Sequence, residues 1–173
     1  MRSSALSAGT YFGRPEDARL FGALALCRTR YAPRQVLPAH AHDEPYLCLA
    51  LSGSFRERSE RSEFEVVAGT VALHRAGETH ADRFGPAPAS CLNVSFPRAW
   101  GERLGGWSDA GPARYAPRAA LGGLGARLAR EFEAPDEASE LALEGLTLEL
   151  LALFARREHA REARAPAWMP ALC

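Results

Sequence analysis

Two histidines separated by one residue, His40 and His42, have the spacing of a ligand pair in the stretch LPAHAHDEPYLCLALSGSF (37–55). Side chains two positions apart on a β-strand point to the same face, roughly 7 Å apart at about 3.3 Å per residue. That separation suits two ligands of one cation. The pair therefore predicts a metal-binding edge of a barrel, with contacts to an organic ligand or a purely structural role as the alternatives.

A third imidazole is available from the stretch GTVALHRAGETHADRF (69–84), which contains His74 and His80. Alternation places His80, Asp82 and Phe84 on one face, whereas His74 is predicted to face away, before a turn at 75–77. Asp82 could orient His80 or coordinate directly. Neutral imidazoles suit Zn, Ni, Cu or Fe better than Mg or Ca, and three of them leave an open position.

The sequence therefore predicts four metal-binding residues: His40, His42, His80 and Asp82. Together they would hold one divalent transition metal, Zn, Ni or Fe. The alternative is that the protein has no cofactor.

Short strands between about Arg19 and Phe96 must position these residues. The segments, separated by Gly or Pro, are RLFGALALCRTRYAP, RQVLPAHAH, PYLCLALSG, SFRERSE, SEFEVVAG, TVALHRAG, ETHADRFG and ASCLNVSF, a pattern typical of a barrel or sandwich. The alternation in SFRERSERSEFEV predicts a half-exposed hairpin turning near 60–62. The segment YLCLALSG is apolar on both faces, which predicts a strand covered on both sides.

Helices are predicted after Pro97. A loop-rich bridge is followed by RAALGGLGARLAREFEAP, which has leucines at helical spacing, and then by EASELALEGLTLELLALFARREHARE, whose start Asp136 can cap. Leu141 and Leu148 lie off the main apolar stripe of the second helix. That helix therefore either packs on its own domain alone or also forms a dimer.

Composition narrows the class of protein. A chain of 173 residues is most simply one domain with an appendage, and 21 basic and 21 acidic residues give it no bulk attraction for nucleic acid. The sequence contains neither a signal-peptide pattern nor a run of about 18 apolar residues, so a cytoplasmic location is predicted. Cys27, Cys48 and Cys91 lie in separate apolar runs and are predicted to be buried, reduced thiols.

The segments HAHDEPYLCLALSG (40–53) and GTVALHRAGETH (69–80) resemble the paired motifs of the cupin superfamily. In that pattern a double-stranded β-helix barrel carries a histidine pair, a downstream acidic ligand and a third histidine. Tyr46 stands where the pattern has its ligating glutamate. Arg34, Arg75 and Phe84 replace the leading glycine, the proline and the terminal asparagine, so the resemblance implies the barrel but not the complete ligand set.

A narrower resemblance covers about Leu20 to Trp168. The barrel motifs, the following helices and the ending PAWMP look like the N-terminal sensor domain of AraC-type bacterial transcription regulators. The resemblance implies a mainly β fold, a cupin double-stranded β-helix (jelly-roll) barrel followed by C-terminal α-helices. The implied parts are the barrel at 1–96, a helical segment at 97–165 and the start of a linker at 166–173.

The resemblance also implies an effector-sensing and dimerisation function. A small molecule or a metal would bind in the barrel, and a homodimer would form through the C-terminal helices. DNA would be bound only by a helix-turn-helix module for which the residues after Trp168 leave no room, so the chain is read as an excised sensor domain or a truncated product.

For an organic effector the predicted contacts are Tyr46, Arg75 and Phe84, since a barrel interior is the usual pocket. The alternative function is a mononuclear metal-dependent cupin enzyme, a dioxygenase or isomerase, using a three-histidine centre. The missing glutamate favours the sensor, so no catalytic residue is assigned.

Overall fold

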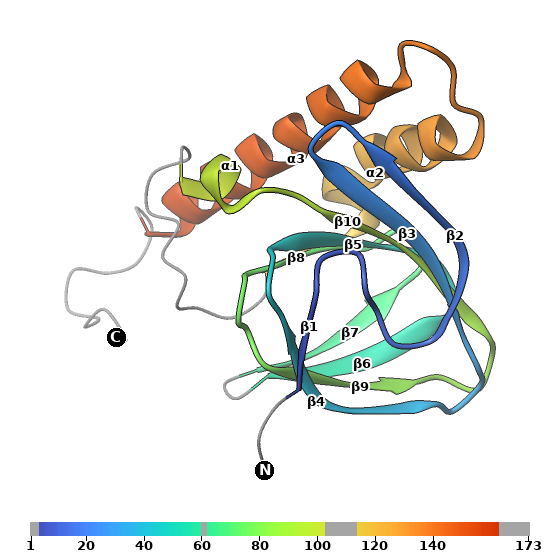
Figure 1. Ribbon diagram of the computed structural model, residues 1–173. Helices are drawn as coiled ribbons and strands as arrows, with labels where there is room; N and C mark the ends of the chain where they lie inside the picture. Colours follow the sequence, from blue (N-terminus) through green and yellow to red (C-terminus); the bar gives the residue numbers. More distant parts are fainter. Residues whose placement is uncertain (1–3, 60–61, 103–113, 163–173) are drawn as a thin grey trace.

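The computed structural model describes residues 4–59, 62–102 and 114–162 (Figure 1). Its strands form two sheets. The five-stranded sheet has the order β1 (Ser4–Leu6), β4 (Val36–His42), β9 (His80–Phe84), β6 (Ser54–Ser59) and β7 (Glu63–Val67). The six-stranded sheet has the order β11 (Arg114–Ala116), β8 (Val71–His74), β5 (Tyr46–Ser52), β10 (Ala89–Ser95), β3 (Leu24–Tyr31) and β2 (Arg14–Phe21).

The chain alternates between the two sheets. From β4 onward it passes to β5 in the six-stranded sheet and returns to the five-stranded sheet for β6 and β7. It then crosses to the six-stranded sheet for β8, back for β9 and over again for β10. Neighbouring strands pair antiparallel except β1 with β4. This winding defines a double-stranded β-helix, so the predicted fold class, a cupin jelly-roll barrel followed by C-terminal helices, is confirmed.

One crossing between the sheets requires glycine. Gly53 joins β5 to β6 with a φ of +73°, and an added Cβ would lie 2.6 Å from the Pro88 carbonyl oxygen. A positive φ is readily adopted only by glycine, and no side chain fits against that carbonyl. The predicted end of the first motif at Gly53 is thus a structural corner of the barrel.

Both helices after the barrel cover one sheet. α2 (Arg118–Glu133) and α3 (Ser139–Glu162) lie across the outer face of the six-stranded sheet, while the short α1 (Arg98–Glu102) follows β10 (Figure 1). The Asp136 carboxylate accepts a hydrogen bond from the Ala138 N–H at 2.8 Å, as expected of a cap near the start of α3. No helix among residues 4–59, 62–102 and 114–162 is long and apolar enough to cross a membrane.

Two cores lie on opposite faces of the six-stranded sheet. Leu47 and Leu49 of β5 face outward and pack with α2 and α3 residues such as Leu128. Tyr46 and Cys48 of the same strand face the barrel interior. β5 is therefore covered on both sides, as its sequence predicts, and one strand connects the barrel interior to the helices.

Two features differ from the predictions. The segment beginning at Arg19 contains the end of one strand and the whole of the next, because the chain turns at Gly22, whose φ is +54°, between β2 and β3. The bridge after Pro97 contains a strand, β11, which pairs with β8 at the edge of the sheet. The hairpin of β6 and β7 is confirmed, although residues 60–61 of its turn and the predicted linker at 166–173 lie outside the described residues.

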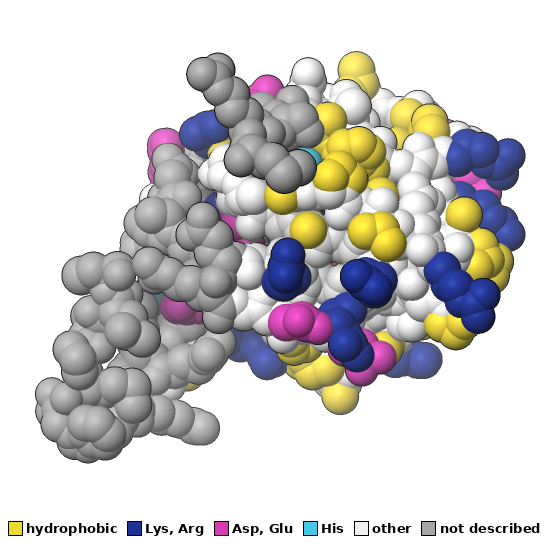
Figure 2. Space-filling model, turned by 90° about the horizontal axis from the view of Figure 1, so that it is seen from below, with side chains coloured by type: hydrophobic (Ala, Val, Ile, Leu, Met, Phe, Trp, Pro, Cys, Tyr) yellow, Lys and Arg dark blue, Asp and Glu magenta, His cyan; other side chains and the backbone are white. Residues whose placement is uncertain are grey.

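The outer surface of the barrel carries both charges. Seen from below, basic and acidic side chains lie beside one another with hydrophobic side chains between them, and almost no histidine surface is visible (Figure 2). Arg56 and Glu63, on paired strands, form one such ion pair at 3.2 Å. Four of the histidines, in contrast, are buried inside.

Candidate metal centre

Three of those buried histidines converge inside the barrel. His40 and His42 come from β4, and His80 begins β9, which pairs with β4 so that His40 and His80 are direct partners. Each is at most 5% exposed. One nitrogen from each lies within 4.8 Å of the other two, so the three imidazoles predicted as ligands can reach one ion.

The turn before β9 sets the position of His80. Gly77, with a φ of +75°, donates its N–H to the His42 carbonyl oxygen at 2.8 Å. This bond fastens the turn that precedes His80 to the strand that carries His42. The glycine spacing of the second motif is thus what brings the third histidine to the first two.

Backbone groups orient the imidazoles. His40 Nδ1 donates to the Pro38 carbonyl at 2.9 Å, and His80 Nδ1 lies 3.4 Å from the Glu78 carbonyl. His42 hydrogen-bonds to the backbone of Thr10. Metal-binding histidines characteristically donate from one ring nitrogen in this way and present the other to the ion. The donor set therefore fits a transition metal of the kind predicted.

Burial keeps these imidazoles neutral. It lowers the pKa of His42 from 6.5 to about 4, with the neighbouring His40 as a further cause, and it lowers the pKa values of His40 and His80 too. A ligand must be deprotonated to bind a metal. The three side chains are consequently in the metal-binding form at neutral pH.

The free space beside the histidines is small. The cavity measures about 20 Å³, room for about one water molecule. Aromatic rings close it: Tyr11 lies 5.0 Å from the His42 ring and Phe12 lies 4.8 Å from the His40 ring, between centroids. A single ion fits this space as it stands, whereas an organic effector would require the aromatic wall to move.

Tyr46, at the position where the cupin pattern has a glutamate, lies directly beside the histidines. Its hydroxyl donates to His80 Nε2 at 3.2 Å, and its ring lies 4.5 Å from that of His42. Phe84 also lines the cavity and stacks on Tyr31 at 4.1 Å. Arg75 is buried, but it is not among the residues lining the cavity, and its backbone N–H donates to the Glu78 carboxylate at 3.2 Å.

Asp82 lines the cavity without joining the three-histidine cluster. Its Oδ1 is buried and has no hydrogen-bond partner among the described residues. Burial raises the pKa of this carboxyl from 3.8 to about 7. Asp82 was predicted to orient His80 or to coordinate the metal directly. The groups that orient His80 are instead the Tyr46 hydroxyl and the Glu78 carbonyl.

The prediction that His74 faces away from the barrel interior is wrong. His74 is 1% exposed, stacks on the Tyr46 ring at 4.4 Å and lines the cavity. β8 pairs with β5 in a register that sets His74 opposite Tyr46, so both side chains share the inner face. The outer face of β8 is taken by Val71 and Leu73, which pack in the core shared with the helices.

Glu57 is the other residue that sequence reasoning did not select. It is 2% exposed on β6, faces Asp82 across the β6–β9 pair, and accepts a hydrogen bond from Tyr115 at 2.8 Å. Burial, followed by the neighbouring Asp82, raises the pKa of its carboxyl well above the usual value. The signal was present in the alternation, because Glu57 shares a strand face with the apolar Phe55.

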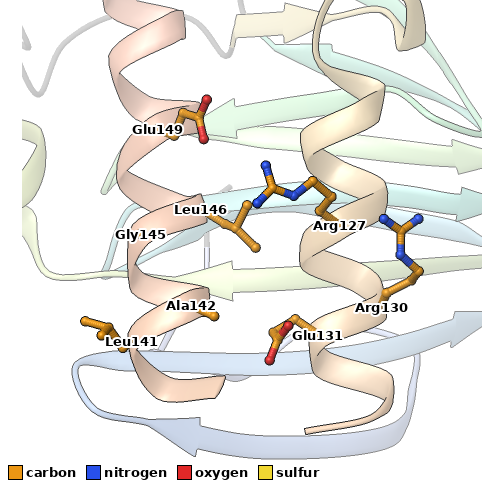
Figure 3. A pocket seen from close by; sticks show the side chains of 8 residues that line it. All are labelled: Arg127, Arg130, Glu131, Leu141, Ala142, Gly145, Leu146 and Glu149. Atoms are coloured by element: carbon orange, nitrogen blue, oxygen red, sulfur yellow. The ribbon is translucent and has the colours of Figure 1, made fainter. Parts of the chain in front are cut away.

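An open groove of about 490 Å³ lies between α2 and α3 (Figure 3). Its lining residues are Arg127, Arg130, Glu131, Leu141, Ala142, Gly145, Leu146 and Glu149. They include no histidine or cysteine, and the helices cover the outer face of the sheet. The groove is thus separate from the histidine cluster.

Comparison with known proteins found no matching protein-family model and no matching curated protein. Among solved structures, a double-stranded β-helix protein from Klebsiella pneumoniae is 20% identical over 52% of this chain and 83% of its own, with a TM-score of 0.42. A DMSP lyase from Ruegeria pomeroyi is 21% identical over 43% of this chain and 38% of its own, with a TM-score of 0.41.

An oxalate decarboxylase variant from Bacillus subtilis is 22% identical over 47% of this chain and 23% of its own, with a TM-score of 0.40. The matched part spans well under two thirds of both enzymes. Likeness at this level says nothing about activity, and the fold assignment rests on the strand order of the chain itself. By that order the protein is a cupin-type double-stranded β-helix with a histidine cluster inside its barrel.

Proposed function

We propose that this chain is the effector-sensing domain of an AraC-type transcription regulator, and that its effector is one divalent transition metal, Zn, Ni or Fe. His40, His42 and His80 would hold the ion. The observation that carries the proposal is the convergence of three neutral, backbone-oriented imidazoles on a small cavity of about 20 Å³. That space suits an ion better than an organic molecule.

The path from the site to the rest of the regulator supports a sensor. Tyr46 contacts His80, while the next residue of β5, Leu47, packs in the core shared with α2 and α3. A shift of β5 on metal binding would therefore reach the helices through direct contacts. A ligand shifts such an equilibrium only by its difference in affinity for the two arrangements, so the helices must differ between metal-free and metal-bound protein.

Dimerisation through the C-terminal helices is part of the same proposal. Leu141 and Leu148 on α3 are 77% and 39% exposed, so they are free to contact a second copy. DNA binding would belong to a helix-turn-helix module of the same regulator.

The second candidate is a metal-dependent cupin enzyme. It is favoured by the protonatable groups that line the same cavity as the histidines, Tyr46, Glu57 and Asp82. A metal bound by three imidazoles would supply an open position and Lewis acidity. These residues would then hold or move a proton beside it.

The Zn(II) affinity of the protein and the hydrogen-exchange protection of its helices together test the sensor function. Untagged protein is stripped of metal and titrated with Zn(II) against a chromophoric chelator, and amide hydrogen exchange in α2 and α3 is measured with and without the ion. We expect the His42→Ala variant to bind Zn(II) at least about tenfold more weakly and to lose the exchange response. His159→Ala, which removes an exposed histidine on α3, is the matched control.

Unchanged affinity in His42→Ala would remove the three-histidine assignment. Metal binding that leaves α2 and α3 exchange unchanged would remove the sensor and favour the enzyme. Turnover of a chelating substrate by the metal-loaded protein, lost in His42→Ala, would then establish the enzyme.

A further inference from the structure

A second group of potential ligands lies on the other side of His80. Glu57 from β6, His74 from β8 and His80 from β9 each offer one atom within 4.8 Å of the other two, and all three are buried. Neither Glu57 nor His74 stands at a ligand position of the cupin pattern. This group therefore has to be explained on its own geometry.

The spacing of two of its atoms fits a shared ion. His74 Nδ1 lies 3.5 Å from Glu57 Oε1. Two ligands each about 2.1 Å from one ion, at a tetrahedral angle, stand roughly 3.4 Å apart. Although the distance would also suit a long polar contact, His74 Nδ1 has no hydrogen-bond partner among the described residues.

Two buried carboxyl groups face each other beside this set. Glu57 and Asp82 are direct partners across β6 and β9, both are buried, and Asp82 Oδ1 has no hydrogen-bond partner in the described part of the chain. Buried carboxylates facing each other are costly unless a cation or protons compensate them. An ion between Glu57 and His74 would satisfy the orphaned nitrogen and reduce this repulsion.

The carboxylate is also held in place, as ligands usually are. Tyr115 donates to Glu57 Oε1 at 2.8 Å, and its ring stacks on Phe64 at 4.1 Å. The His74 ring is fixed by stacking on Tyr46. Such outer contacts orient the ligands of a metal and tune its affinity.

We propose that Glu57, His74 and His80 form a second cation position in the barrel, a two-histidine, one-carboxylate set for Zn(II) or a similar divalent ion. Because His80 belongs to both sets, a single ion takes one position or the other. Tyr115 lies on β11, which directly precedes α2, so one hydrogen bond connects the second position to the strand before that helix. This ligand set can be tested independently of the three-histidine centre.

The test measures the binding that remains when the first set is damaged. Metal-stripped full chain is titrated with Zn(II) against a chromophoric chelator for the wild type, His42→Gln, and His42→Gln combined with Glu57→Gln. We expect His42→Gln still to bind one ion, and the double variant to bind at least about tenfold more weakly than His42→Gln. His42→Gln combined with Glu63→Gln is the matched control, because Glu63 is an exposed glutamate on the partner strand.

Folding is controlled in two ways. Glutamine at position 57 keeps an oxygen that accepts the Tyr115 hydrogen bond, and the melting temperature of each metal-free variant is recorded. If the Glu57 variant does not fold, His74→Phe replaces it, because phenylalanine keeps the stacking on Tyr46 and removes the ligand.

The outcomes separate this proposal from the proposed function. Equal affinity of His42→Gln with and without Glu57→Gln, or no binding by His42→Gln, overturns the second position and leaves the three-histidine centre standing. Wild-type affinity in His42→Gln, lost on adding Glu57→Gln, supports the second position and overturns the first. No binding by the wild type overturns both.

Discussion

At the proposed metal centre, Tyr46 would compete with the ion for His80. In the structure its hydroxyl donates to His80 Nε2 at 3.2 Å, while His80 Nδ1 faces the Glu78 carbonyl. An ion held through Nε2 would take the lone pair that accepts this hydrogen bond. The bond would therefore have to break on binding, and Tyr46→Phe removes the competitor without changing the ring that stacks on His74.

The size of the effect follows from the burial of both groups. His80 is 3% and Tyr46 is 4% exposed, so the loss leaves a buried acceptor unsatisfied, which costs about 1–3 kcal/mol. The cost falls on the metal-free protein alone, since the ion satisfies Nε2 in the bound protein. We expect Tyr46→Phe to bind Zn(II) about 5- to 150-fold more tightly than the wild type.

Two measurements check the prediction. Chelator competition gives the Zn(II) affinity, and the melting temperature of the metal-free protein should fall by roughly 2–12 °C. The matched control is Tyr31→Phe, which loses a hydrogen bond from Thr29 Oγ1 of 3.1 Å inside the same barrel. That variant should lose stability without gaining affinity.

Weaker or unchanged Zn(II) binding in Tyr46→Phe would refute this reasoning. Weaker binding would show that the hydroxyl assists the ion. Unchanged binding with a lowered melting temperature would show that His80 Nε2 is not a ligand.

Three further predictions concern stability and assembly. The pKa of His42 is lowered to about 4 in the folded protein, so below pH 6.5 the unfolded chain binds more protons. The free energy of unfolding of the metal-free protein, measured by denaturant titration, should therefore fall by roughly 3 kcal/mol between pH 6.5 and 4. In His42→Gln the fall should be smaller. Phe132→Ala, in the core between α2 and the sheet, should lower the free energy of unfolding by about 3–5 kcal/mol, against almost none for Leu20→Ala at 80% exposure. Leu141→Glu with Leu148→Glu should shift a dimer to monomer in sedimentation while leaving the melting temperature within a few degrees; an unchanged mass would remove α3 from the interface.

Local pattern was sufficient for much of the barrel. Apolar residues on both faces of Tyr46–Ser52 predicted a strand covered on both sides, and glycine at positions 53 and 77 predicted turns that the backbone indeed makes with positive φ. The spacing of these glycines in the two motifs also selected His80 as the third histidine beside His40 and His42. These features depend on neighbours close in the sequence or on residue types with strict backbone preferences.

Only the tertiary structure decided which polar groups meet one another in the interior. Both faces of β8 are buried, so alternation could not show whether His74 or Leu73 faces inward; pairing with β5 decided it. Tyr115 reaches Glu57 only because β11 joins the edge of the sheet. The sequence determined the histidine pair, the third histidine and the strands that carry them, whereas strand pairing between distant segments decided which buried charges meet, because register depends on both partners at once.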